Sequence, residues 1–303
     1  MDTISNRMVQ IAGKLTGTGV AIVTPFRKDD SVDFKSLARL VNYQIENKVD
    51  YIVVLGTTGE SVTLSNDEKH AVIDAVIECV DKRVPLVVGI GGNNTQEIIN
   101  KIQSFDFEGI TAILSVSPYY NKPNQRGILE HYKAIAAESS LPVIIYNVPG
   151  RTGSNITAET TLQLAHEVKN IVAVKEASGN MIQIMDIIKN KPKNFLVISG
   201  DDALTLPILS LGGNGAISVV ANAFPKEYSE MVSLALDKKI QEARTVHYKL
   251  LDLINATFAE GNPAGIKAIL AIKGLTGNFL RLPLVPVSNQ LYNRLTELTN
   301  ELG

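Results

Sequence analysis

The sequence predicts an α/β protein of the (β/α)8 barrel class (a TIM barrel), in which eight parallel strands close into a ring surrounded by helices. Eight short runs of apolar, often β-branched residues recur along the chain, as expected for strands covered on both faces. Segments with helical spacing of apolar residues separate these runs, and strict alternation of strand and helix indicates a parallel sheet. A doubly wound open sheet is the alternative, but it rarely needs eight such regular units.

The expected strands share a short length and a continuous apolar character. They are GVAIVTPF (19–26), YIVVLG (51–56), PLVVGIG (85–91), GITAILSVSP (109–118), PVIIYNVP (142–149), IVAVKEAS (171–178), FLVISG (195–200) and GAISVVAN (215–222). Helices are expected between them, for example over 34–48, 66–80, 95–105 and 125–139. Ser65, followed three residues later by Glu68, has the spacing of a capping box and predicts that a helix begins there.

The chain divides into two parts without an obvious linker. Residues 1–237 contain all eight strand runs and are expected to form the barrel that carries the active site. Residues 238–303 contain no further strand run and are expected to form a helical C-terminal region packed on the barrel.

Composition excludes several classes of function. The 303 residues have a net charge of −2 with charges mixed along the chain, so neither nucleic acid nor a membrane surface is an expected partner. The single cysteine, Cys79, lies on the expected buried face of a helix and is interpreted as a structural thiol. No apolar run resembles a signal peptide or is long enough to span a bilayer, so a cytoplasmic location is expected.

Lys175 stands out because it lies inside an otherwise apolar strand. Burying an ammonium group costs several kcal/mol unless the group is paired or loses its proton. One interpretation is an ion pair with Glu176 or with an aspartate of SGDD (199–202). The other is that desolvation favours the neutral amine, which attacks carbonyl carbons to form a Schiff base. We favour imine chemistry, because Lys175 lies at the strand end where such barrels carry their active sites.

Other polar residues follow the strands toward the same rim. GTTGES (56–61) supplies turn amides and two hydroxyls suited to a carboxylate, although it could also be an ordinary connecting turn. The tyrosines at 119, 120 and 146 could move protons through Thr57, or could simply pack. Arg151 could bind a carboxylate through two nitrogens, or be a solvated surface residue.

Metal and nucleotide chemistry is not indicated. The four histidines fall in separate expected helices with no ligand spacing, so no metal site is predicted. No glycine-rich dinucleotide motif or Walker motif is present, and no cofactor is expected. The glycines of LGGNGAIS precede the eighth strand, where a helix C-cap is the better interpretation.

Five of these segments, GTTGES, SPYYNKP, YNVPGRTG, VKEASGN and SGDD, together resemble the dihydrodipicolinate synthase family of class I aldolases. That family belongs to the N-acetylneuraminate lyase superfamily, and the resemblance extends from GVAIVTPF to RLPLVPVS (281–288). It implies a (β/α)8 barrel, usually assembled as a homotetramer (a dimer of dimers). It also implies a lyase that condenses pyruvate with L-aspartate 4-semialdehyde in diaminopimelate and lysine biosynthesis.

The resemblance assigns a role to each matching residue. Lys175 would form the Schiff base with pyruvate, so no separate cofactor is implied. The proton relay would comprise Thr57, Tyr146 and Tyr120, with Tyr120 reaching into a neighbouring subunit. Thr57 and Thr58 would hold the pyruvate carboxylate, and Arg151 would bind that of the semialdehyde. Backbone positions lining the pocket match Gly200 and Ile217.

The second substrate separates members of this superfamily. Relatives that cleave sialic acid or sugar acids bind a polyol and usually lack an arginine after the YN-P turn. Arg151 therefore favours the synthase over N-acetylneuraminate lyase or a sugar-acid aldolase, which is the alternative.

The resemblance also implies an allosteric pocket, with one departure from the pattern of lysine-inhibited relatives. The matching positions here are Ser61, Asn66, Lys69, Asn93, Glu97 and Tyr119. Relatives inhibited by lysine commonly carry histidines where Asn66 and Lys69 stand.

We therefore predict weak or absent feedback inhibition by free lysine, because the Lys69 ammonium would repel a cationic ligand. Initial rates measured over a lysine titration test this prediction. Inhibition at micromolar lysine would contradict it.

Overall fold

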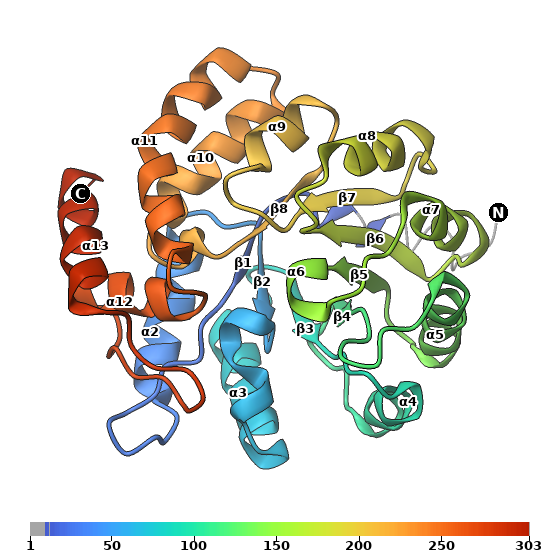
Figure 1. Ribbon diagram of the computed structural model, residues 1–303. Coiled ribbons are helices and arrows are strands. Elements are labelled where there is room, and N and C mark those ends of the chain that lie inside the picture. Colours follow the sequence, from blue (N-terminus) through green and yellow to red (C-terminus); the bar gives the residue numbers. More distant parts are fainter. Residues whose placement is uncertain (1–9, 12, 303) are drawn as a thin grey trace.

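The computed structural model describes residues 10–11 and 13–302 and contains a closed barrel of eight strands in sequence order. Every neighbouring pair is parallel, and β1 pairs with β8 to close the ring. Figure 1 shows the strands at the centre with helices around them. The predicted (β/α)8 class is confirmed, and the open doubly wound sheet is excluded.

The strands are shorter than the apolar runs that predicted them. They are β1 (Gly17–Ala21), β2 (Tyr51–Val54), β3 (Leu86–Gly89), β4 (Ala112–Val116), β5 (Val143–Asn147), β6 (Ile171–Glu176), β7 (Leu196–Ser199) and β8 (Gly215–Ser218). The largest difference is β1, which was predicted over 19–26 but ends at Ala21. The run also contains Pro25, which has no amide hydrogen to contribute to a ladder.

The helices follow the expected alternation. They are α2 (Phe34–Glu46), α3 (Asn66–Val80), α4 (Thr95–Ser104), α5 (Gln125–Glu138), α6 (Pro149–Thr152), α7 (Ala158–Glu167), α8 (Met181–Asn190), α9 (Thr205–Ser210), α10 (Pro225–Leu236), α11 (Ile240–Phe258), α12 (Ala264–Ile272) and α13 (Asn289–Leu302). The capping box that predicted the start of α3 is present, with reciprocal bonds between Ser65 and Glu68. Among the described residues, no helix is both long and apolar enough to cross a bilayer.

Two apolar clusters make up the core. One lies between the strands and the surrounding helices, and the other fills the inside of the barrel with residues such as Tyr51, Val87 and Ile198. Cys79 packs against the outer cluster but is only partly buried, whereas the sequence predicted a buried thiol. This partial burial raises the pKa of the Cys79 thiol. Tyr146 and Ile217 belong to the inner cluster, which brings two predicted site residues to the barrel interior.

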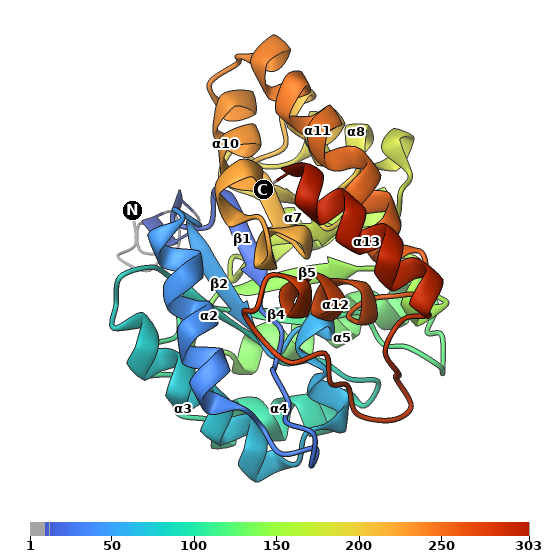
Figure 2. The same cartoon turned by 90° about the vertical axis from the view of Figure 1, so that its left-hand side faces the viewer.

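The C-terminal region consists of α11, α12 and α13, and α13 packs on both α11 and α12 (Figure 2). The predicted boundary at 237 falls in the turn between α10 and α11, where the two helices pack closely. Gly265 permits a tight approach of α12 to α11, because a Cβ there would lie 2.0 Å from the Thr257 carbonyl oxygen. The division at 237 stays a prediction.

The C-terminal region is tied to the barrel by a fully buried ion pair. The Lys267 ammonium contacts the Glu60 carboxylate, and both side chains are 0% exposed. Lys267 also donates to the Phe279 carbonyl oxygen at 2.9 Å and lies 4.1 Å from the centre of the Phe26 ring. Burial lowers the Lys267 pKa to about 8, against the raising effect of Glu60.

Arg281 makes a second connection to the segment that follows β2. Its backbone amide donates to Glu60, and its guanidinium contacts the Glu68 carboxylate and the Thr63 carbonyl oxygen. The hydrogen bonds from Arg281 lower the pKa of Glu68 to about 2. The segment from Glu60 to Glu68 is therefore held in place by residues more than two hundred positions later in the chain.

Replacing one partner of the buried pair should destabilise the fold strongly. Lys267→Met leaves the Glu60 carboxylate buried without its cation, which should lower the free energy of unfolding by about 3–5 kcal/mol. Urea denaturation measures this loss, and adding Glu60→Gln should restore most of it. Lys133→Met is the matched control, since the Lys133–Glu167 pair is solvent-exposed and should contribute little. Equal losses in the two single variants would contradict the prediction.

Candidate active site

Lys175 lies in β6, directly beside Tyr146 of β5 in the strand register. Its side chain is only 5% exposed, and its Nζ lies 4.2 Å from the centre of the Tyr146 ring. No ion pair joins Lys175 to a carboxylate among the described residues. The interpretation that Lys175 pairs with a buried carboxylate is therefore not supported by the structure.

Glu176 is occupied by a separate buried network. Its carboxylate accepts hydrogen bonds from the amides of Asn147 at 2.8 Å and Gln183 at 2.6 Å, and from the backbone of Ser178 at 3.0 Å. Successive residues of a strand point to opposite faces, so Glu176 points away from the side that carries Lys175. Asp202 of SGDD likewise accepts from the Val219 and Val220 amides.

The absence of a side chain at Gly200 makes room for Lys175. A Cβ at Gly200 would lie 3.0 Å from Cε of Lys175 and 2.8 Å from Cβ of Ala177, closer than side chains normally pack. Gly200 follows β7, and Ile217 lies in β8 with 1% exposure. Gly200 therefore lies beside Lys175 at the end of the neighbouring strand, and Ile217 lies one strand further along the ring.

The predicted carboxylate-binding turn is a single turn of 3-10 helix, η1 (Thr57–Gly59), directly after β2. The Glu60 amide closes it by donating to the Thr57 carbonyl oxygen at 3.1 Å. Glu60 itself has a left-handed backbone with φ of 51°, an unusual conformation for a residue with a side chain. Its carboxylate is the one held by Lys267, which offers a physical reason why this conformation persists.

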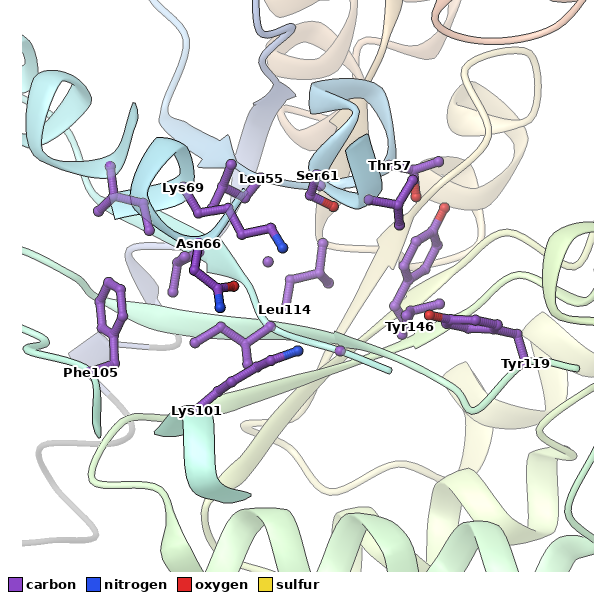
Figure 3. A pocket seen from close by; sticks show the side chains of 18 of the residues that line it. Leu55, Thr57, Ser61, Asn66, Lys69, Lys101, Phe105, Leu114, Tyr119 and Tyr146 are labelled. Atoms are coloured by element: carbon purple, nitrogen blue, oxygen red, sulfur yellow. The ribbon is translucent and has the colours of Figure 1, made fainter. Parts of the chain in front are cut away.

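The two threonines of the turn have different surroundings. A cavity of about 630 Å³ opens at the barrel mouth. Thr57 lines it, and so do Tyr146 and Arg151. The hydroxyl of Tyr146 points toward that of Thr57 (Figure 3). Thr58 is buried, and its hydroxyl accepts a hydrogen bond from the Asn262 amide at 3.0 Å. The cavity thus brings together Thr57, Tyr146 and Arg151, and Thr58 supports the turn from behind.

Arg151 lies in the short helix α6 after β5 and is not merely a solvated surface residue. Its guanidinium donates to the Asn262 carbonyl oxygen at 3.2 Å while still lining the cavity. Asn262 therefore contacts both Thr58 and Arg151, which were predicted to bind the two substrate carboxylates.

Tyr120 is not brought to this cavity. It is 89% exposed, with a positive φ of 74°. Its neighbour Tyr119 does line the cavity, and the Tyr119 carbonyl oxygen accepts from the Asn93 amide at 3.2 Å. A role for Tyr120 within its own barrel therefore has no support in the structure.

The far end of the cavity lies between α3 and α4. Of the predicted allosteric residues, the cavity is lined by Ser61, Asn66, Lys69 and Tyr119, but not by Asn93 or Glu97. Lys101 and His70 also line this end.

The four histidines lie in four different helices, α3, α5, α7 and α11. No cluster of three or more potential metal ligands occurs in the described part of the chain. Burial lowers the pKa of His131 to about 4, and its ring nitrogen lies 2.8 Å from the Thr95 hydroxyl.

Two residues at this site could not be predicted from the sequence: Lys101, which lines the cavity, and Asn262, which contacts Thr58 and Arg151. Asn262 lies in the C-terminal region, 204 positions from the threonine that it contacts, and an isolated asparagine in a loop carries no signal. Lys101 stands on the polar side of an amphipathic helix, where a lysine is ordinary. Only the packing of α4 beside α3 reveals its position.

The fold and the site together define a (β/α)8-barrel enzyme built around a buried strand lysine. The chain matches the dihydrodipicolinate synthetase family over residues 14–302, and it belongs to that family. It is 54% identical over 289 residues to 4-hydroxy-tetrahydrodipicolinate synthase from Parabacteroides distasonis, covering 95% of this chain and 97% of the relative.

Solved structures of dihydrodipicolinate synthases have the same fold as this chain. Dihydrodipicolinate synthase from Aquifex aeolicus superimposes with a TM-score of 0.92 at 40% identity, covering 95% of this chain and 98% of that one. The chloride-inhibited enzyme from Acinetobacter baumannii in complex with pyruvate gives a TM-score of 0.91 at 42% identity, with coverages of 95% and 98%.

Asn262 should act as a positioning residue for substrate binding. Asn262→Ala removes the hydrogen bond to Thr58, so the KM for pyruvate should rise about two- to tenfold while kcat changes less. Steady-state kinetics with a melting curve for each variant test this. Asn278→Ala, in the same region but without a bond to the turn, is the control. A loss of melting temperature with KM unchanged would indicate a purely structural role.

Proposed function

We propose that this chain is a lyase that condenses pyruvate with L-aspartate 4-semialdehyde to give 4-hydroxy-tetrahydrodipicolinate. This is the first committed step of diaminopimelate and lysine biosynthesis. The observation that carries the proposal is Lys175, a buried lysine at the mouth of the barrel that makes no ion pair with a carboxylate among the described residues. The name and near-complete coverage of the Parabacteroides relative support the same reaction.

The reaction begins with imine formation at Lys175. The neutral amine attacks the ketone carbon of pyruvate, and the ketone oxygen leaves as water after two protons are delivered to it. Tyr146 and Thr57 would move these protons, and the way their hydroxyls face each other at the cavity supports this role. The imine, protonated on nitrogen, then loses a proton from the methyl group and becomes a neutral enamine.

The enamine carbon attacks the aldehyde carbon of the second substrate and forms the new carbon–carbon bond. The aldehyde oxygen takes a proton and becomes the 4-hydroxyl group. The amine of the semialdehyde then attacks the imine carbon, which closes the ring and releases Lys175. No separate cofactor is required by this sequence, because Lys175 itself supplies the electron sink.

Two groups of residues would bind the substrate carboxylates. Thr57 and Thr58 would hold that of pyruvate in the turn after β2. Arg151 would bind that of the semialdehyde through charge-assisted hydrogen bonds. Gly200 and Ile217 would line the pocket, with Gly200 leaving the space that Lys175 occupies.

The full site requires a second subunit in this proposal. Tyr120 would complete the proton relay of a neighbouring barrel, and its 89% exposure supports such a role. A homotetramer, built as a dimer of dimers, would provide that neighbour. We place the enzyme in the cytoplasm, as its proposed biosynthetic role requires.

Pyruvate consumption by the purified protein separates the synthase from the lyase alternative. We expect consumption with aspartate semialdehyde and not with N-acetylmannosamine, because Arg151 suits a carboxylate rather than a polyol. Arg151→Gln should raise the KM for the semialdehyde about ten- to a hundredfold, as loss of a charged hydrogen bond predicts. The control is Arg244→Gln, an exposed arginine on α11.

Pyruvate consumption with N-acetylmannosamine but not with aspartate semialdehyde would assign the chain to the sialic acid and sugar-acid aldolases. It would leave the chemistry at Lys175 intact and overturn the role of Arg151.

A further inference from the structure

The register between β5 and β6 brings a second polar pair together directly after Tyr146 and Lys175. Asn147, the last residue of β5, lies opposite Glu176, the last residue of β6. Successive strand residues point to opposite faces, so this pair points to the other side of the sheet from Tyr146 and Lys175. Both side chains are fully buried, and the Asn147 amide donates to the Glu176 carboxylate at 2.8 Å. Nothing in the proposed reaction uses this buried pair.

Asn147 closes the loop that carries Arg151. Its side-chain oxygen accepts from the Ile156 backbone amide at 3.0 Å, and its side-chain amide donates to the Ile156 carbonyl oxygen at 3.3 Å. The residues between these two positions form α6 and the turn after it, and they include Arg151. The loop therefore begins and ends on one side chain, and a change in the orientation of that side chain would release the end of the loop.

Glu176 is a buried carboxylate that makes no ion pair among the described residues. Burial of a carboxylate without a cation costs free energy, which hydrogen bonds must offset. Here the side-chain amides of Asn147 and Gln183 and the backbone amide of Ser178 donate those bonds. An ionised carboxylate only accepts hydrogen bonds, so it imposes an orientation on every amide that contacts it.

This property of the carboxylate orients a chain of side-chain amides. Asn147 and Gln183 must turn their nitrogen atoms toward Glu176, which leaves their oxygen atoms to face other donors. The Gln183 oxygen accepts from the Asn155 amide at 2.8 Å, and the Asn155 oxygen accepts from the Asn147 amide at 2.9 Å. None of these side chains has a buried polar atom without a partner. A network that satisfies every group in one arrangement holds the residues that it joins in a single conformation.

Arg151 depends on the base of its loop because few contacts hold the guanidinium itself. The side chain makes one hydrogen bond among the described residues, to the Asn262 carbonyl oxygen at 3.2 Å. The helix that carries Arg151, α6, has only four residues, so its direction depends on how the two ends of the loop are held.

We infer that Glu176 is a positioning residue for Arg151, and through it for the choice of the second substrate. The carboxylate fixes Asn147, Asn147 closes the loop, and the loop holds the guanidinium at the cavity. This inference rests on the proposed function, in which Arg151 binds the carboxylate of the semialdehyde. Lys175 would supply the imine chemistry, and the next register pair along β5 and β6 would determine which aldehyde meets it.

Asn147→Asp tests this role, because it places a second carboxylate against that of Glu176. Like charges at hydrogen-bond distance repel, so the new side chain turns away and the loop loses its closure. The KM for aspartate semialdehyde should rise at least about tenfold, as disruption of a buried hydrogen-bond network predicts. The KM for pyruvate should change by less than about twofold, and borohydride should trap the pyruvate imine at Lys175 as in the wild type. Hydrogen exchange of the backbone amides in residues 148–156 should become faster.

A second substitution should reverse this damage. With Glu176→Gln added, the new carboxamide can donate to the new carboxylate at position 147 while its oxygen still accepts from Ser178. The amides of Gln183 and Asn155 can turn over together, so each donor again meets an acceptor. The double variant should therefore recover most of the semialdehyde affinity and the slow exchange of the loop, which two independent losses of stability would not produce.

Asn170→Asp is the matched control. Asn170 precedes β6 at the opposite end of the barrel and donates to three backbone carbonyl oxygens, so its substitution should lower the melting temperature without changing either KM. Equal rises of both KM values in Asn147→Asp, unchanged exchange in residues 148–156, or no recovery in the double variant would overturn the inference. Failure of the wild type to consume pyruvate with the semialdehyde would overturn the proposed function instead, and the exchange measurements would still test how the loop is positioned.

Discussion

The parallel pairing of β5 with β6 is the constraint on which the chemistry of this barrel depends. The register places Lys175 opposite Tyr146, so the amine and the aromatic ring meet without any loop having to position them. Because the barrel is closed, β7 must lie on the other side of β6, and Gly200 at its end leaves space for the lysine. The proposed nucleophile, Lys175, is thus positioned by strand geometry, which is more rigid than a loop.

The turn after β2 depends on the C-terminal region for its shape. Glu60 adopts a left-handed backbone, and its buried carboxylate is held by Lys267, while Asn262 holds Thr58. The region beyond the barrel therefore supports the turn of the candidate site from behind, although none of its described residues lines the cavity itself. This explains how a short turn with few internal bonds can present Thr57 to the cavity in a fixed position.

Sequence alone predicted the barrel and its central lysine because both leave local signals. Continuous apolar runs indicate strands that are covered on both faces, and a lysine inside such a run is easily recognised. The ends of the strands were predicted less accurately than their presence. In β1 the apolar run continues beyond Ala21, where the strand ends. Asn262 and Lys101 could not be predicted, since their roles arise from contacts between distant segments.

The two ends of the cavity differ in how strongly the fold constrains their side chains. At the barrel mouth, Tyr146 and Lys175 are constrained by strand register, so a substitution there disturbs both packing and chemistry. At the other end, Lys69 and Lys101 stand on the polar sides of α3 and α4, where a change of charge alters no core contact. A substitution at that end should therefore disturb the fold less than one at Tyr146 or Lys175.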